Sequence, residues 1–179
     1  MKTLFQALRL FLLLTLLTGV AYPLAVTAVT RLVFPRQTGG SLVYHDGKAV
    51  GSALLAQKFE SPRYFWPRPS AGDYATVPSG ASNLGPTSEA LKKAIADRRA
   101  KFGADAPMEL LTASGSGLDP HLSPQTAAWQ VARVAAARGL DAGRVAALVA
   151  EVTEPPQWGI FGEPRVNVLA LNLRLDDLK

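Results

Sequence analysis

Residues 10–30, LFLLLTLLTGVAYPLAVTAVT, decide how the chain is organised. This stretch contains no charged residue, and Arg9 and Arg31 bound it. At about 1.5 Å per residue, a helix of this length reaches roughly 31 Å, which matches a hydrocarbon core of about 30 Å. The stretch therefore predicts a transmembrane helix near the amino terminus.

A cleaved secretory signal is the main alternative, because the leader is basic and Val26, Thr27 and Ala28 resemble a small-residue cleavage site. The hydrophobic region of a signal, however, spans only about 7–15 residues. A buried core helix is disfavoured, since the rest of the chain is too short to enclose a charge-free helix of this length. The sequence favours an uncleaved anchor.

Pro23 is the one irregular position inside the predicted span. A proline leaves a backbone carbonyl of the helix unpaired, which is better tolerated when a neighbouring helix covers it. Thr18, Gly19 and Thr27 lie near Pro23, and small or hydroxylated residues allow helices to approach closely. We expect these four residues to pack against a partner helix, with lipid around the rest of the span.

The net charge of +5 is concentrated around the span. Lys2, Arg9, Arg31 and Arg36 flank it, and the remaining chain is nearly neutral, with all 14 acids and 15 of the 19 bases. This distribution disfavours nucleic acid as a partner.

The chain has no cysteine and only two histidines, so no metal site is predicted.

The pattern predicts an anchor over residues 1–36 and one soluble α+β domain over residues 37–179, with a small sheet and about three helices. A hairpin is expected around Asp46 and Gly47, a favoured turn pair. Capping residues predict helices that begin after Thr87 or Ser88, after Ser123 and after Asp141. Apolar runs predict strands over residues 108–113 and 165–175.

Residues 57–86 are rich in proline, glycine and aromatic residues, which forbids a regular element. A long irregular loop in a compact domain is usually functional. One interpretation is that these residues wrap irregularly around the domain and are attached to the core by their aromatic side chains. The other is a docking surface for a partner, because aromatic residues and arginine anchor interfaces. The candidate docking residues are Arg63, Tyr64, Phe65, Trp66, Arg68 and Asn83.

The loop of Ser114, Gly115, Ser116 and Gly117 precedes a predicted helix, an arrangement that can bind phosphate through backbone amides. It lacks the lysine of a P-loop, and the alternative reading of this loop is a tight turn.

Gln130 and Arg133 share a face of the following helix and complete the nucleotide-associated candidates.

Ser116, Asp119 and His121 suggest a hydrolase, but three members of a catalytic triad that lie within six residues of one loop can rarely point at one another. We expect no catalytic residue on this chain.

Five motifs stand out along the chain: residues 64–71 (YFWPRPSA), 79–86 (SGASNLGP), 112–121 (TASGSGLDPH), 130–138 (QVARVAAAR) and 162–172 (GEPRVNVLALN). Together they resemble the KdpC family, the C subunit of the high-affinity, ATP-driven bacterial potassium transporter. Ala81 departs from the family pattern, where many members have a second glycine. The resemblance covers essentially the whole chain, including the single amino-terminal span.

The resemblance implies a complex with three other subunits: a channel-like potassium-binding subunit, a P-type catalytic subunit that hydrolyses ATP, and a small single-span subunit. It implies an assembly factor and catalytic chaperone that raises the ATP affinity of the catalytic subunit. No cofactor is expected to bind tightly, ATP association would pass through the catalytic subunit, and potassium is the transported ion. The rival class is a membrane-anchored or secreted hydrolase or binding domain.

The expected location is the inner membrane, with the amino terminus in the cytoplasm and the domain in the periplasm. Basic residues near the two ends of the span almost balance, so the positive-inside rule does not decide. The short basic leader resembles an export signal, and long domains translocate largely regardless of charge. The alternative is a cytoplasmic domain that lends Gln130, Arg133 or the loop of residues 114–117 to bound ATP.

Overall fold

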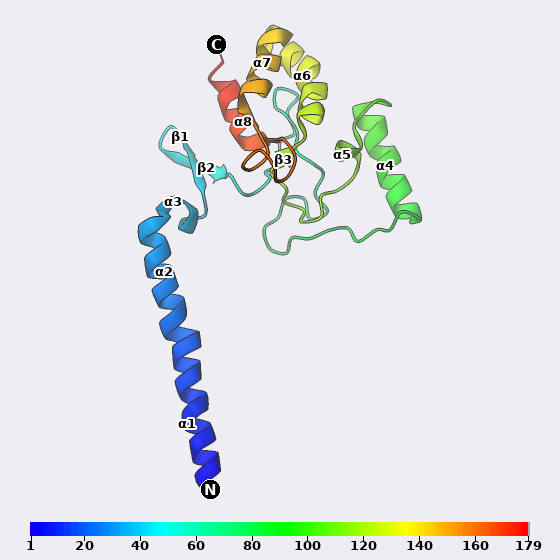
Figure 1. Ribbon diagram of the computed structural model, residues 1–179. Coiled ribbons are helices and arrows are strands. Elements are labelled where there is room, and N and C mark those ends of the chain that lie inside the picture. The colour runs from blue at the N-terminus through cyan, green and yellow to red at the C-terminus, as the bar shows by residue number, and fades with distance from the viewer. Residues whose placement is uncertain (179) are drawn as a thin grey trace. The chain divides into compact units, whose positions relative to one another are not determined.

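The computed structural model describes residues 1–178, which divide into two compact units. The first unit is Met1–Leu42, and the second begins at Val43. The first unit is helical up to the start of a hairpin, and the second combines helices with short strands (Figure 1). The predicted α+β class is confirmed.

The first unit contains one long apolar helix over Lys2–Val33. It consists of α1 (Lys2–Leu16), a π-helical turn η1 (Leu17–Ala21) and α2 (Tyr22–Val33), and the short α3 (Pro35–Thr38) follows. None of its side chains is buried within the unit. By length and composition this helix could cross a membrane, as residues 10–30 predict.

Pro23 accounts for the π-helical turn. Its ring would clash with the carbonyl one turn earlier and it has no N–H to donate, and a wider turn relieves both problems. The hydroxyl of Thr18 donates to the carbonyl of Leu14, and that of Thr27 donates to the carbonyl of Pro23, each at 2.7 Å. Apart from its chain neighbours and the backbone of the helix itself, no atom lies within 4 Å of where a Cβ on Gly19 would stand. Small residues at the turn therefore leave an open surface on the helix.

The predicted hairpin is confirmed. Strand β1 (Leu42–His45) pairs with β2 (Lys48–Ser52). Asp46 and Gly47 between them have φ angles of 49° and 74°. Positive φ at both central residues is the requirement of the type I′ turn, which Asp-Gly satisfies at low cost.

All three capped helices are confirmed. They are α4 (Glu89–Phe102), α6 (Pro124–Arg138) and α7 (Ala142–Val152). The side chains of Ser88, Ser123 and Asp141 accept backbone N–H groups in the first turns of these helices. Each cap satisfies a donor that the helix itself leaves unpaired.

Both strands predicted from apolar runs are largely wrong. Residues 108–113 contain a short helix, α5 (Met108–Leu111). Residues 165–175 contain only the short strand β5 (Arg165–Asn167), after which the chain turns into α8 (Val168–Asp176). Asn167 caps α8 by accepting the N–H of Ala170 at 3.1 Å.

The second unit therefore holds more elements than predicted. From Val43 to Leu178 it contains five helices and parts of two small sheets, rather than about three helices and one sheet. The second sheet has the order β3-β5-β4, with β5 between β3 (His121–Leu122) and β4 (Thr153–Glu154). Both pairings are antiparallel.

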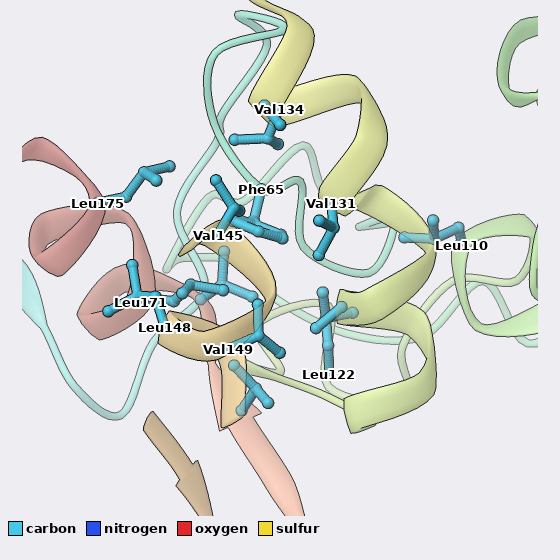
Figure 2. Close-up of a cluster of buried hydrophobic side chains, with 14 residues drawn as sticks. Phe65, Leu110, Leu122, Val131, Val134, Val145, Leu148, Val149, Leu171 and Leu175 are labelled. Carbon is cyan, nitrogen blue, oxygen red and sulfur yellow. The ribbon is translucent and has the colours of Figure 1, made fainter. Parts of the chain in front are cut away.

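The core lies where α6, α7 and α8 meet, and one residue of the irregular segment belongs to it. Figure 2 shows the side chain of Phe65 among side chains of these helices. Phe65, Leu110, Val134, Val145 and Leu171 are all 0% exposed. The irregular segment is thus fastened to the core through an aromatic residue.

Candidate functional site

Two carboxamide side chains hold the irregular segment by its backbone. Asn172 on α8 accepts the N–H of Phe65 at 2.8 Å and donates to its C=O at 3.0 Å. Gln130 on α6 does the same for Trp66, at 2.9 and 3.0 Å. Both amides are buried, at 1% and 0% exposed. Because Phe65 and Trp66 are consecutive, the two amides replace the neighbouring strands that this irregular backbone lacks.

Arg133 is the third residue of this arrangement. Its guanidinium donates to the carbonyls of Pro62 and Tyr64 at 2.7 and 3.0 Å and to Oε1 of Gln130. The same group lies 3.5 Å from the ring centre of Trp66, a close cation–π stack. Burial lowers the pKa of Arg133 to about 10, which leaves it charged at neutral pH.

Arg138 extends the attachment by one helical turn. It donates to the backbone carbonyl of Arg63 at 2.7 Å and lies 4.9 Å from the ring centre of Tyr64. It also forms an ion pair with Asp176 at 2.7 Å, and the hydroxyl of Tyr64 donates to the same carboxylate at 3.1 Å. We call Gln130, Arg133, Arg138, Asn172 and Asp176 the clasp, and residues 62–86 the docking segment.

Arg68 and Tyr74 fix the middle of the docking segment. Arg68 pairs with Asp119 at 3.3 Å, and both side chains are about one-third exposed or less. The hydroxyl of Tyr74 donates to the carbonyl of Arg68, while its N–H donates to Oγ of Ser70, both at 2.9 Å. Burial, with a smaller contribution from the charge of Asp73, raises the pKa of Tyr74 to about 12.

The loop of residues 114–117 lies against the docking segment. The N–H of Ser114 donates to the carbonyl of Pro69 at 2.9 Å, and Ser114 is only 2% exposed. Gly117 has φ +73°, and a Cβ there would stand 2.8 Å from the carbonyl oxygen of Gly80. Glycine is therefore required twice over, for its backbone angle and for this close approach. Gly115 and Ser116 are the exposed residues of the loop.

A pocket of about 270 Å³ opens beside the docking segment. Trp66 and Tyr74 line one side, and Arg98, Lys101 and Phe102 of α4 line another. The Nζ of Lys101 lies 5.8 Å from the ring centre of Trp66 and 5.5 Å from that of Phe102. The pocket thus combines aromatic rings of the docking segment with basic side chains of α4, and Glu60 and Asp73 add two carboxylates to its lining.

The chain matches one family model over nearly its full length. Residues 4–177 match the model described as KdpC: K+-transporting ATPase, c chain. The chain belongs to the KdpC family.

Curated relatives agree with this assignment. A potassium-transporting ATPase KdpC subunit of Rhodospirillum rubrum is 56% identical over 187 residues, covering 99% of this chain and 96% of the relative. The KdpC subunit of Polaromonas naphthalenivorans is 54% identical, covering 97% and 93%, and that of Cereibacter sphaeroides strain ATCC 17029 is 52% identical, covering 95% and 94%. The apolar amino-terminal helix fits membrane localisation for a member of this family.

The structure brings two predicted sets of residues together. Four residues that were predicted to associate with nucleotide contact the docking segment from the core side. They are Ser114, Gly117, Gln130 and Arg133. Their binding groups point at protein backbone, and Gln130 has no exposed surface.

The docking candidates divide by exposure. Phe65 is a core residue, whereas Tyr64, Trp66 and Arg68 are half-buried. Arg63 and Asn83 are exposed, together with most of residues 75–87. Asn83 has φ +53°, a left-handed conformation that asparagine tolerates better than most residues. The accessible part of the segment is therefore its tip and the side chain of Arg63.

Sequence reasoning missed Asn172 and Asp176 of the clasp and the wall formed by α4. Asn172 interrupts an otherwise apolar run, and a buried polar side chain needs partners, so it could have been singled out. Nothing local to Asp176 signals its pair with Arg138, which is 38 positions away.

The residues considered for a hydrolase do not assemble a nucleophile and base. Oγ of Ser116 accepts the N–H of Leu118 at 3.0 Å. Oδ1 of Asp119 accepts the N–H of His121 at 3.0 Å and lies 3.8 Å from its Nδ1. These bonds shape the turn into β3.

Proposed function

We propose that the chain is a non-catalytic accessory subunit that assembles and stabilises a potassium-transporting P-type ATPase. The observation that carries this proposal is the clasp, which fixes the backbone of residues 62–66 from the core side, while the tip of the docking segment stays exposed. A surface that is ordered before it binds loses little conformational entropy on binding. The proposed partners are the channel-like potassium-binding subunit, the P-type catalytic subunit and the small single-span subunit.

We propose that the span crosses the inner membrane with the amino terminus in the cytoplasm and the domain in the periplasm. The short basic leader before a long apolar run supports this orientation. ATP is cytoplasmic, so an effect on the ATP affinity of the catalytic subunit then passes through neighbouring subunits. Such allosteric coupling typically amounts to about 1–3 kcal/mol.

The geometry around Gln130 and Arg133 supports this indirect route, because both side chains serve the docking segment. Direct contact with ATP would have to use Gly115 and Ser116, the exposed residues of their loop. We expect Ser116→Ala in the assembled complex to leave the ATP concentration for half-maximal hydrolysis unchanged. A several-fold increase would favour direct contact.

The docking role is tested by removing exposed side chains that the domain does not need. The double variant Arg63→Ala, Asn83→Gly keeps the left-handed backbone at position 83. Co-expressed with the other subunits, it should recover several-fold less of them, while the melting temperature of the full chain alone stays within 1–2 °C, a shift that corresponds to roughly 0.5 kcal/mol or less. Arg99→Ala, on an exposed face of α4, is the matched control. Equal recovery by the double variant would contradict the docking role.

The orientation is tested with protease added to sealed spheroplasts and to inside-out vesicles. A periplasmic domain is digested in spheroplasts and protected in the vesicles. The opposite pattern would place the domain in the cytoplasm and make direct contact with ATP possible.

A further inference from the structure

A hairpin between β4 and β5 presents three large apolar side chains to solvent. Trp158, Ile160 and Phe161 at its tip are 81%, 78% and 60% exposed. None of the three belongs to the hydrophobic core or to the partly buried residues that pack against it. We call these three residues the apolar knob. The apolar knob therefore does not contribute to the hydrophobic core of the domain.

The knob is held in a defined shape. The N–H of Gln157 donates to the carbonyl of Phe161 at 2.8 Å, and the N–H of Phe161 donates back at 3.0 Å. The rings of Trp158 and Phe161 meet edge to face at 5.9 Å. The base of the hairpin is the pairing of β4 with β5, whose Val166 is fully buried. The hairpin that carries the exposed side chains is thus attached to the core.

The backbone conformation of Trp158 is also unfavourable for a tryptophan. Its φ angle is +56°, and the next residue, Gly159, has φ +76°. A bulky residue rarely adopts positive φ, and glycine or asparagine would do so at lower free energy. A large aromatic ring stands here although both its backbone and its exposure are unfavourable in the free chain.

Charge at the base of the hairpin restricts what can cover the knob. Ion pairs join Glu154 to Arg165 and Glu151 to Arg174. Glu163, two residues after the knob, has no ion pair within residues 1–178. Because the other two carboxylates are paired, Glu163 is the one of these three whose negative charge is uncompensated, and it repels anionic lipid headgroups. A basic rim around an apolar recess on a protein is the complementary surface.

We propose that the apolar knob inserts into an apolar recess with a basic rim on another subunit of the potassium-transporting ATPase. The inference rests on the proposed function, since it requires partner subunits, but it assigns a surface separate from the docking segment. Aromatic side chains that fill pockets dominate the binding energy of interfaces, and a preformed hairpin keeps the entropic cost low.

The test uses the full chain, affinity-tagged and co-expressed with the other subunits of its complex. Trp158→Ser with Phe161→Ser should reduce the recovered partner subunits at least 10-fold, without lowering the melting temperature of the full chain alone. Leu54→Ser is the matched control, because Leu54 is as exposed as Phe161, at 60%, and lies outside the hairpin. Glu163→Lys leaves the apolar side chains in place and should weaken recovery several-fold through repulsion from the basic rim.

Several outcomes would overturn the proposal. Recovery of the partner subunits by the knob variant at the wild-type level would do so, and the proposed function would stand because the wild-type chain still assembles. If the wild-type chain recovered no subunit, the proposed function itself would fail. Knob-dependent binding to phosphatidylglycerol vesicles would identify lipid as the occupant, and knob-dependent dimerisation of the full chain in detergent would identify a second copy.

Discussion

Asn172 pairs with both the N–H and the C=O of Phe65, at 2.8 and 3.0 Å, although the two residues are 107 positions apart in the chain. This pair places the start of the docking segment on α8, and Gln130 repeats the arrangement for Trp66 on α6. The docking segment and the core of the domain are therefore joined at consecutive residues.

Replacing Asn172 tests how much the clasp contributes to stability. Asn172→Leu leaves the N–H and C=O of Phe65 buried without partners, which costs about 1–3 kcal/mol for each group. We expect the free energy of unfolding, measured by chemical denaturation of the full chain, to fall by at least about 2 kcal/mol. Gln125→Leu, at an exposed position of α6, is the control. A loss no larger than that of the control would contradict the clasp.

Arg133 is expected to resist replacement by lysine. A lysine keeps the charge but cannot donate to the carbonyls of Pro62 and Tyr64 together while stacking flat on Trp66. Arg133→Lys should therefore destabilise the chain nearly as much as Arg133→Ala, by roughly 1.5–3 kcal/mol. Full rescue by lysine, seen as an unchanged melting curve and an unchanged near-ultraviolet signal of tryptophan, would show that charge alone matters.

Replacement by alanine should destabilise the chain at one glycine of the loop of residues 114–117 and not at another. Gly117→Ala places a Cβ 2.8 Å from the carbonyl oxygen of Gly80 at a φ of +73°, and the left-handed conformation alone costs about 1–2 kcal/mol. Gly115→Ala meets no atom within 4 Å. Thermal melts should show a loss only for Gly117→Ala. Similar melting temperatures for both variants would mean that the loop does not pack against the docking segment.

Stability should depend on pH through His121. Burial, and secondly the charge of Arg165, lower the pKa of His121 below its usual value of 6.5. The unfolded chain then takes up a proton more readily than the folded chain, so stability is full above about pH 6.5 and falls as the pH decreases through that value. His121→Gln should flatten the curve of melting temperature between pH 7 and 5, whereas His45→Gln, at the end of β1, should not. An equal slope for wild type and His121→Gln would contradict this assignment.

Gly19 offers a probe of packing in the membrane. A side chain at this position meets nothing within the chain, so Gly19→Leu costs the isolated span no contact. If a partner helix approaches there, the added leucine should reduce recovery of the other subunits several-fold, and Ala25→Leu should have a smaller effect. Undiminished assembly of Gly19→Leu would leave the span as a tether only.

Local chemistry made much of the fold predictable. Ser88, Ser123 and Asp141 cap helices where their side chains satisfy free N–H groups, and Asp46 with Gly47 makes the expected turn. These features depend on neighbours within a few residues, so the sequence alone reveals them.

The run after Arg165 shows where such reasoning fails. A run that is apolar on all sides suits a buried strand and a buried helix equally. The spacing of the buried residues Val168, Leu171, Asn172 and Leu175 is helical, and Asn167 is a cap, but these signals count only once the run is known to end its strand at Asn167. The attachment of the docking segment to the clasp was beyond prediction for a related reason, since the bonds between them join residues 64 to 112 positions apart.

Hydrogen–deuterium exchange of the full chain, alone and in the assembled complex, tests the central claim most directly. Residues 75–87 are exposed except Gly80, so their amides should exchange quickly in the isolated chain. The amides of Phe65 and Trp66, which donate to Asn172 and Gln130, should already be protected. Docking predicts that exchange across residues 75–87 slows at least 10-fold in the complex. Equal exchange there in both states would contradict the claim that this segment is the docking surface.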